Sequence, residues 1–197
     1  MRTLGRIVCL NGTSSAGKTS IGRAMQDLLH PEVWFLCGID TFLSMGSSRA
    51  FQEDAIHVWR PEPGGGVSCD LRPAGMRLLT GMYGAAAALI GAGNNVIFDD
   101  VSLSADLMKE CALAFSPFDS LFVGVRCDLE VLAQREMERA NRTEGAAIGM
   151  AAKAHEHAVY DFEVDTTHNS AEECAAAIVR RLRTGVPGTA LAQLVKA

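Results

Sequence analysis

Along most of the chain, short runs of consecutive apolar residues alternate with longer stretches in which apolar residues recur at the spacing of a helix. A short run of apolar residues without polar alternation is typical of a strand that is buried on both faces of a sheet. The expected strands are residues 7–10, 33–39, 95–98, 121–125 and 162–164. Strands separated by helices in this way predict an α/β fold with a mostly parallel sheet.

The expected helices have recognisable ends. Ser104 suits the N-cap of one helix, and Asp128 suits the N-cap of the next. Ser170 or Asn169 suits the N-cap of the last long helix, where Glu172 or Glu173 would complete a capping box. The expected helices are residues 20–29, 74–90, 104–114, 129–140, 150–159 and 170–183.

Two stretches depart from this alternation. Residues 41–70 contain aromatic side chains, prolines and the glycine run 64–66 without a clear period, so we expect an irregular segment. An irregular stretch of this length in a compact domain is usually functional, and its aromatic residues argue against a disordered surface loop. At the other end, the linker 185–188 leads to an apolar tail that either docks on the body or frays.

Composition narrows the classes of protein that the chain can represent. A length of 197 residues favours one domain. The net charge of −5 argues against a general nucleic-acid binder, and no apolar run is long enough to span a membrane. The N-terminus does not resemble a signal peptide, and the six cysteines have neither C-x-x-C pairs nor metal spacing. We therefore expect a cytoplasmic protein with reduced, mostly buried thiols.

The motif with the clearest chemistry is the run GTSSAGKT, which matches the phosphate-binding pattern G-x-x-x-x-G-K-[ST]. It lies between the first expected strand and the first expected helix, where backbone N–H groups can surround phosphates. Lys18 can reach the terminal phosphates, and the Thr19 hydroxyl can ligate Mg²⁺. We therefore expect a nucleoside triphosphate and Mg²⁺ to bind here. The predicted nucleotide-binding residues are Gly12, Thr13, Ser14, Ser15, Ala16, Gly17, Lys18, Thr19 and Ser20.

Three acidic residues follow expected strands, at the edge of the sheet where ligands bind in this fold class. Asp99 and Asp100 are candidates for the metal site, since P-loop enzymes hold Mg²⁺ with an aspartate after a strand. Neighbouring side chains on a strand point to opposite faces, so only one of the pair should face the metal. Turn or N-cap roles are the alternative. Asp40 could accept a proton from an acceptor hydroxyl or cap the segment that follows it.

Three arginines have helical spacing. Arg135, Arg139 and Arg142 fall on one stripe of a helix, and arginines near a transferring phosphoryl group stabilise its charge. They are therefore candidate catalytic residues. The alternative is a solvated helix in which Glu136 and Glu138 neutralise the arginines. The other titratable candidates lack metal spacing and are expected to be ordinary surface or capping residues: His57, His155, His157 and His168.

These motifs resemble those of the chloramphenicol phosphotransferases, a family of antibiotic O-phosphotransferases with a P-loop kinase fold. The matching segments run in order across nearly the whole chain, up to Arg183. The most specific are the Met-Ala-Ala-Lys block and the Glu-Val-Asp-Thr-Thr-His block. The matching segments are residues 10–19, 38–40, 65–68, 97–101, 123–128, 135–136 with 139 and 142, 149–153 and 160–168.

The resemblance implies a three-layer fold with a five-stranded parallel sheet and helices on both faces, over residues 1–183, followed by the tail 184–197. It implies ATP-dependent phosphorylation of chloramphenicol, or of a similar hydroxylated antibiotic, at the 3-hydroxyl. Asp40 would be the base, residues 41–72 the acceptor-binding segment and residues 135–149 an arginine-bearing lid. The chain departs from the family mainly between residues 41 and 64, so another hydroxylated metabolite stays open as the acceptor.

The acceptor segment carries two kinds of side chain. Arg49 and Arg60 would pair with an anionic acceptor if they converged beside Asp40, and would favour a neutral acceptor if they faced solvent. The apolar residues of this segment suit a neutral aromatic ligand. They are Phe42, Leu43, Met45, Phe51, Val58 and Trp59.

Two other classes fit the sequence less well. A GTPase switch usually carries an N-K-x-D motif, which this chain lacks. A kinase of nucleic-acid ends usually presents a basic surface with aromatic side chains, whereas this chain is acidic. A small-molecule acceptor is therefore expected, and homo-oligomer formation stays open.

Overall fold

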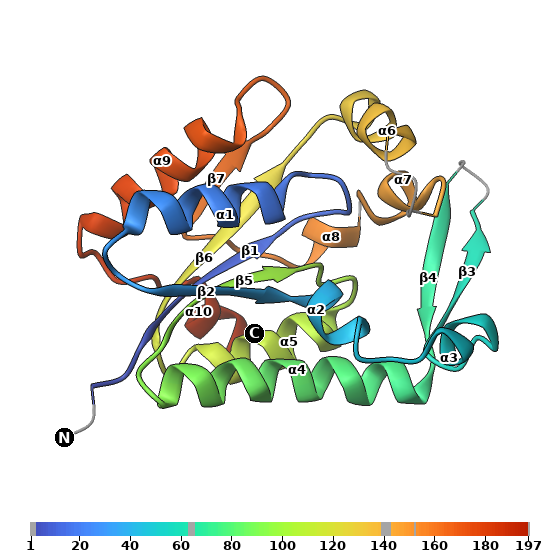
Figure 1. Ribbon diagram of the computed structural model, residues 1–197, viewed down its shortest axis with the longest axis horizontal. Helices are drawn as coiled ribbons and strands as arrows, with labels where there is room; N and C mark the ends of the chain where they lie inside the picture. The colour runs from blue at the N-terminus through green and yellow to red at the C-terminus, as the bar shows by residue number, and fades with distance from the viewer. Residues whose placement is uncertain (1–2, 63–65, 139–142, 152, 197) are drawn as a thin grey trace.

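The computed structural model describes residues 3–62, 66–138, 143–151 and 153–196. A five-stranded sheet with the strand order β2-β5-β1-β6-β7 lies at its centre (Figure 1). Every pairing within this sheet is parallel, which confirms the predicted sheet. Its strands are β1 (Arg6–Asn11), β2 (Trp34–Gly38), β5 (Asn95–Asp100), β6 (Asp119–Arg126) and β7 (Phe162–Asp165).

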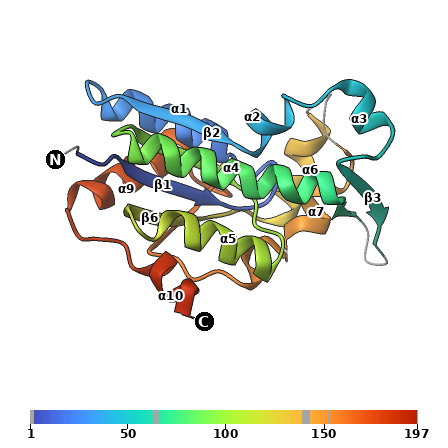
Figure 2. The same ribbon diagram turned by 90° about the horizontal axis from the view of Figure 1, so that it is seen from below.

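Helices cover both faces of the sheet, so the molecule has three layers (Figures 1 and 2). The apolar residues of α1 (Lys18–Leu29) and α9 (Ala171–Arg183) pack on one face. The residues of α4 (Pro73–Gly91), α5 (Ala105–Phe115) and α10 (Ala190–Lys196) pack on the other. The predicted α/β fold with helices on both faces is therefore confirmed.

The central strand shows why the expected strands lack polar alternation. Ile7 and Cys9 of β1 belong to the core beneath α4 and α5, whereas Val8 and Leu10 belong to the core beneath α1. All four side chains are fully buried. Each buried side chain of this kind contributes about 1.5–3 kcal/mol. A strand covered on both sides must therefore be apolar at consecutive positions.

Residues 41–70 are more regular than expected. They begin within the short helix α2 (Ile39–Leu43) and contain α3 (Ser48–Gln52) and an antiparallel hairpin of β3 (His57–Pro61) and β4. The last strand, β4, is Val67–Leu71. Neither face of the hairpin is fully buried, and polar residues occur on both faces. Because of this mixture, polar and apolar residues do not alternate clearly along the two strands, and the sequence did not predict them.

Two helix predictions need correction after β6. Helix α6 (Leu129–Met137) ends earlier than residue 140, and Arg139 and Arg142 lie outside the residues that the structure describes. The helix expected over residues 150–159 is instead two short helices, α7 (Ala146–Ala151) and α8 (Lys153–Glu156). Among the predicted caps, the Ser104 and Ser170 side chains accept backbone N–H bonds, whereas Asp128 precedes α6 without a side-chain capping bond.

The tail docks on the body. Ala190 and Leu191 of α10 are buried against α5 and β6, and the Asp161 carboxylate accepts the N–H groups of Thr189 and Ala190 at 2.6 and 2.9 Å. The six cysteines are free thiols, and three of them are buried. Within the described ranges, no helix is long and apolar enough to cross a membrane.

Candidate functional site

The phosphate-binding loop lies at the carboxyl end of the central strand and opens helix α1. Gly17 has φ 88°, a left-handed conformation that favours glycine. A Cβ on Gly12 would meet the Val125 carbonyl oxygen at 2.6 Å. The loop therefore needs these two glycines because of its backbone conformation and its close approach to β6. The loop follows β1 at the same end of the sheet at which Asp99 and Asp100 end β5.

Lys18 lies across the loop rather than in solvent. Its side chain is 8% exposed, and its ammonium nitrogen Nζ donates to the Thr13 carbonyl oxygen at 2.9 Å. The same nitrogen lies 3.5 Å from Oδ1 of Asp99. A buried cation is thus held between a backbone dipole and a carboxylate, at the place where a phosphate chain would need positive charge.

The two consecutive aspartates at the end of β5 face opposite ways, as the alternation of a strand requires. Asp99 Oδ2 accepts the Thr19 hydroxyl at 2.6 Å. Asp100 instead accepts the Tyr83 hydroxyl at 3.1 Å and the Ser102 hydroxyl at 2.8 Å, and burial raises its pKa. Only Asp99 is brought to the loop. The Thr19 and Asp99 oxygens form the donor set that fits Mg²⁺, a cation that prefers oxygen ligands.

Asp40 reaches the same site from the neighbouring strand. It is the second residue of α2, directly after β2, and β2 pairs with β5 so that Gly38 lies opposite Asp99. The N-cap of α2 is Gly38, so Asp40 does not hold the capping position. Asp40, Lys18, Thr19 and Asp99 all line one cavity. The structure therefore brings the candidate base together with the loop lysine and the candidate metal ligands.

This cavity of about 260 Å³ extends from the loop to the β3–β4 hairpin. Among the described lining residues, the charged side chains are Lys18, Asp40 and Asp99, and all three belong to the loop end. The rest of the lining is mostly apolar and comes from α2, the hairpin, α4, α5 and α7. Representative residues are Leu43, Ile56, Trp59, Leu71, Leu79 and Met150. The cavity thus joins a charged end to an apolar chamber.

The hairpin turns one face to the cavity and the other to solvent. His57 and Trp59 of β3 pair with Leu71 and Cys69 of β4, and all four side chains line the cavity. On the other face, Arg60 forms an ion pair with Asp70. Arg49, on α3, has an 83% exposed side chain that pairs with Glu53 at 2.7 Å. The two arginines therefore face solvent and do not converge beside Asp40.

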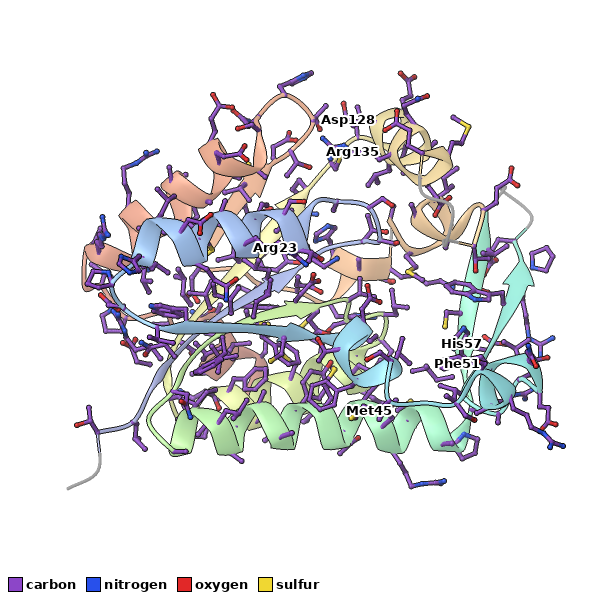
Figure 3. The ribbon with its side chains drawn as sticks, viewed as in Figure 1. Arg23, Met45, Phe51, His57, Asp128 and Arg135 are labelled. Atoms are coloured by element: carbon purple, nitrogen blue, oxygen red, sulfur yellow. The ribbon has the colours of Figure 1, made fainter. Side chains whose placement is uncertain are left out.

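The predicted apolar residues of the acceptor segment lie in different environments. Leu43 and Trp59 line the cavity, whereas Phe42 packs toward α4 and Met45 is exposed. The residue pattern predicted His57 only as an ordinary surface or capping residue, whereas its side chain lines the cavity. Figure 3 shows His57 and Phe51 together on the hairpin side of the molecule. The spacing of two between a histidine and a tryptophan on a strand could have revealed that they share a face.

Arg135 contacts the strand end beside the loop. Its guanidinium donates to the Thr166 carbonyl oxygen at 2.7 Å and to the Thr166 hydroxyl at 3.0 Å. That hydroxyl in turn lies 3.0 Å from the carbonyl oxygen of Ala16 in the loop. Arg135 is in the last turn of α6 and does not line the cavity, and Figure 3 shows it far from His57. In this structure, Arg135 therefore contacts the loop through Thr166.

A buried glutamate connects α6 to the loop. Glu136 is 6% exposed, and its two carboxylate oxygens accept the N–H groups of Gly145 and Ala147, each at 2.7 Å. The carbonyl oxygen of Ala147 then accepts the Thr13 hydroxyl at 2.9 Å. The residue pattern indicated Glu136 only as a partner of the arginines, because its backbone partners depend on a turn that the pattern does not specify.

Asn11 connects the residue before the loop to three other segments. Its amide nitrogen donates to the Ala154 carbonyl oxygen at 2.6 Å and to the Tyr160 hydroxyl at 2.7 Å, and its oxygen accepts the N–H of Ser102 at 3.0 Å. The Tyr160 hydroxyl also lies 2.6 Å from His155 Nδ1. Burial lowers the pKa of His155 to about 4, so this ring is neutral near pH 7.

The parallel sheet and the loop at its carboxyl edge define the P-loop kinase fold. APS kinase of Mycobacterium tuberculosis, solved with AMPPNP and APS, superposes with a TM-score of 0.64 at 15% identity, over 92% of this chain and 99% of that one. Shikimate kinase of Acinetobacter baumannii, solved with shikimate, gives a TM-score of 0.57 at 16% identity, over 93% of this chain and 96% of that one. At such low identities these likenesses concern the fold alone.

A family model described as chloramphenicol phosphotransferase-like protein matches residues 5–183, and the chain belongs to this family. The resemblance inferred from the sequence is thereby confirmed. A protein of Mycobacterium tuberculosis strain H37Rv that is provisionally named an O-phosphotransferase is 34% identical over 187 residues, covering 87% of this chain and 79% of that protein. Its counterpart in strain CDC 1551 matches equally well. Family and relatives together support a phosphotransferase.

Proposed function

We propose that this protein transfers the γ-phosphoryl group of ATP to the hydroxyl group of a neutral, largely apolar small molecule. Chloramphenicol, phosphorylated at its 3-hydroxyl, is the first candidate acceptor. The observation that carries the proposal is the single cavity that joins the phosphate-binding loop to an apolar chamber. An acceptor in that chamber can place a hydroxyl group beside Asp40 and the loop at the same time.

The loop end of the cavity supplies the groups that ATP requires. Backbone N–H groups of the loop and the Lys18 ammonium would bind its phosphates. Thr19 and Asp99 would hold Mg²⁺, which neutralises charge on the β- and γ-phosphates when it is bound. Binding of the phosphate chain would then leave the γ-phosphorus directed toward the chamber.

Asp40 is the proposed base. As the acceptor oxygen forms its bond to the γ-phosphorus and the bond from that phosphorus to ADP breaks, the hydroxyl proton passes to the Asp40 carboxylate. Arg139 and Arg142 are proposed to stabilise charge on the transferring group, and Arg135 to support them through its contact with Thr166. Residues 135–149 would then act as a lid and residues 41–72 as the acceptor-binding segment.

The charge of the lining supports a neutral acceptor. The described charged lining residues are at the loop end, and Arg49 and Arg60 have carboxylate partners outside the cavity. A charged acceptor body would lose hydration in the chamber without gaining a counter-charge. Residues 1–183 are proposed to form one kinase domain in a cytoplasmic protein, which the free thiols support. Modification of an antibiotic would give such a protein a role in resistance.

Transfer of labelled phosphate from ATP tests this proposal. Chloramphenicol should become labelled, whereas an analogue that lacks the 3-hydroxyl should not. Transfer to other neutral alcohols but not to chloramphenicol would discard the antibiotic and keep the phosphotransferase. No transfer to any alcohol in a panel of hydroxylated antibiotics and metabolites would overturn the proposed function.

A further inference from the structure

The end of the cavity remote from the loop contains one imidazole, and the other side chains around it are apolar or only weakly polar. His57 lies at the start of β3, on the face of the hairpin that lines the cavity. Its ring meets Trp59 edge-on, with ring centroids 5.4 Å apart and planes at 81°, and it meets Phe51 at 5.9 Å and 62°. Two aromatic neighbours in this arrangement restrict the orientation of the imidazole ring.

The ring nitrogens of His57 make no hydrogen bond to another residue in the described part of the chain, in contrast to His155. Burial lowers the pKa of His57, although Asp54 opposes this effect, so the ring is neutral near pH 7. A neutral imidazole offers one donor and one acceptor. His57 can therefore satisfy a group on the ligand that donates or accepts a hydrogen bond.

The surroundings of His57 exclude a charged ligand group. The side chains next to it in the cavity, Trp59, Leu71 and Ile56, carry no charge, and the nearest arginine on its hairpin, Arg60, is paired with Asp70 on the opposite face. Asp54, whose charge acts on His57, is exposed and does not line the cavity. A carboxylate or ammonium buried here would therefore lose its hydration without a charged partner in the lining. An uncharged hydrogen-bonding group would keep a partner after it leaves water.

We infer that His57 determines acceptor specificity by hydrogen-bonding an uncharged polar group at the end of the acceptor remote from the reacting hydroxyl. This inference rests on the proposed function and narrows its substrate class. The acceptor is an alcohol with three parts: a hydroxyl at Asp40, an apolar or aromatic body between the hairpin and α4, and an amide-like or hydroxyl-like group at His57. Apolar burial supplies affinity and the two polar ends fix orientation.

Three alcohols that differ only at the remote end test this arrangement. They are 3-phenylpropan-1-ol and its para-carboxamide and para-carboxylate derivatives. Binding is followed by the fluorescence of Trp59, which lines the cavity, over the constant signal of Trp34, which does not. We expect the carboxamide to bind about tenfold more tightly than the unsubstituted alcohol, as one added hydrogen bond allows. The carboxylate should bind most weakly.

Two variants assign this preference to one residue. His57→Phe keeps an aromatic ring against Phe51 and Trp59 but removes both nitrogens, so it should abolish the carboxamide preference. Its affinity for the unsubstituted alcohol should stay within about threefold of the wild-type value, since the apolar contacts remain. His57→Gln keeps a donor and an acceptor and should retain part of the preference. Unchanged thermal midpoints would show that both variants fold.

The binding results test the role of His57, and phosphate transfer to the same alcohols tests the proposed reaction separately. A carboxamide preference that persists in His57→Phe, or wild-type protein that binds the carboxylate as tightly as the carboxamide, would overturn the role of His57. Failure of all three alcohols to bind would overturn it as well. A His57-dependent preference in binding, without transfer of phosphate from ATP to any of the alcohols, would support the specificity role and contradict the phosphotransferase reaction.

Discussion

At the residue scale, the site depends on a few polar groups that are held close together by apolar strands. The Asp99 carboxylate contacts both Lys18 and Thr19. Its Oδ1 lies 3.5 Å from Lys18 Nζ, and its Oδ2 accepts the Thr19 hydroxyl at 2.6 Å. The motif predicted Lys18 and Thr19. The choice between Asp99 and Asp100 required the structure, because the sequence does not reveal which face a strand turns toward a loop.

Replacement of the loop lysine should remove activity without unfolding the protein. Lys18→Ala loses the ammonium group that would bind the phosphates, while the described polar contacts of its side chain are with the Thr13 carbonyl and Asp99. We expect ATP-dependent transfer to fall to background and the circular dichroism spectrum to stay unchanged. Wild-type nucleotide affinity and turnover in this variant would contradict the assignment of the loop.

Replacement of the proposed base should separate chemistry from nucleotide binding. Asp40→Asn keeps the shape of the side chain and removes its basicity, so kcat should fall by roughly 10²–10⁴ while ATP affinity is retained. Asp27→Asn, which changes an exposed aspartate of α1 outside the acceptor-binding segment, is the matched control and should keep wild-type kcat. If Asp40→Asn instead loses ATP affinity and keeps its turnover, Asp40 belongs to the metal site.

At the scale of elements, the apolar pattern predicted each buried strand and long helix but not the parts that shape the site. The β3–β4 hairpin is half covered, so its inward face mixes His57 and Cys69 with Trp59 and Leu71 and its period is weak. Short helices such as α2 and α3 have too few residues to show a period. Elements that line the cavity therefore carry less sequence signal than elements that form the core.

The hydrogen bonds of Glu136, which connect α6 to the phosphate-binding loop, should affect both stability and ATP binding. Glu136→Ala removes the acceptors for the N–H groups of Gly145 and Ala147, and leaving such groups unpaired costs about 1–3 kcal/mol. Because Ala147 also accepts the Thr13 hydroxyl, we expect a higher KM for ATP as well as lower stability. Steady-state kinetics and urea unfolding measure the two effects.

Glu138→Ala is the control for that experiment. Glu138 is exposed near the end of the same helix and accepts a bond from Gln134 at 2.9 Å. Its loss should change the free energy of unfolding by less than about 0.5 kcal/mol and leave KM unchanged. Equal effects of the two substitutions would show that the buried connection has no special part in placing the loop.

At the scale of the whole molecule, the order of apolar runs was sufficient to predict the three layers. Consecutive apolar residues in β1 can be buried only if both faces of the sheet are covered, which excludes an open two-layer sheet. Long-range polar contacts could not be predicted in this way. Asn11 and Tyr160 are 149 positions apart, and nothing in either local sequence specifies that they meet.

The hydrogen bonds that join Asn11, Tyr160 and His155 give a prediction for the pH dependence of the free energy of unfolding. The pKa of His155 is lowered to about 4 in the folded protein, from an ordinary value of 6.5, so the unfolded chain binds more protons between these values. The stabilising contribution is complete above pH 6.5 and is lost as the pH falls toward 4. The free energy of unfolding in urea should therefore depend less on pH in this window in His155→Gln.

His157→Gln is the matched control, because His157 is an exposed neighbour with a 42% exposed side chain. It should reproduce the pH dependence of the wild-type protein. If His155→Gln and the wild-type protein lose stability in parallel between pH 6.5 and 4, other groups must account for the acid sensitivity, and the neutral His155 ring has no part in it.

The cavity is proposed to direct the γ-phosphoryl group of ATP to an alcohol rather than to water. The most direct measurement counts ATP consumed, phosphate released and phosphorylated alcohol formed in the same reaction, with and without chloramphenicol. We expect ATP consumption to require the acceptor, and one phosphorylated alcohol to form for each ATP consumed. Phosphate release at the same rate without any acceptor, and no phosphorylated alcohol, would contradict it and indicate a nucleotide hydrolase.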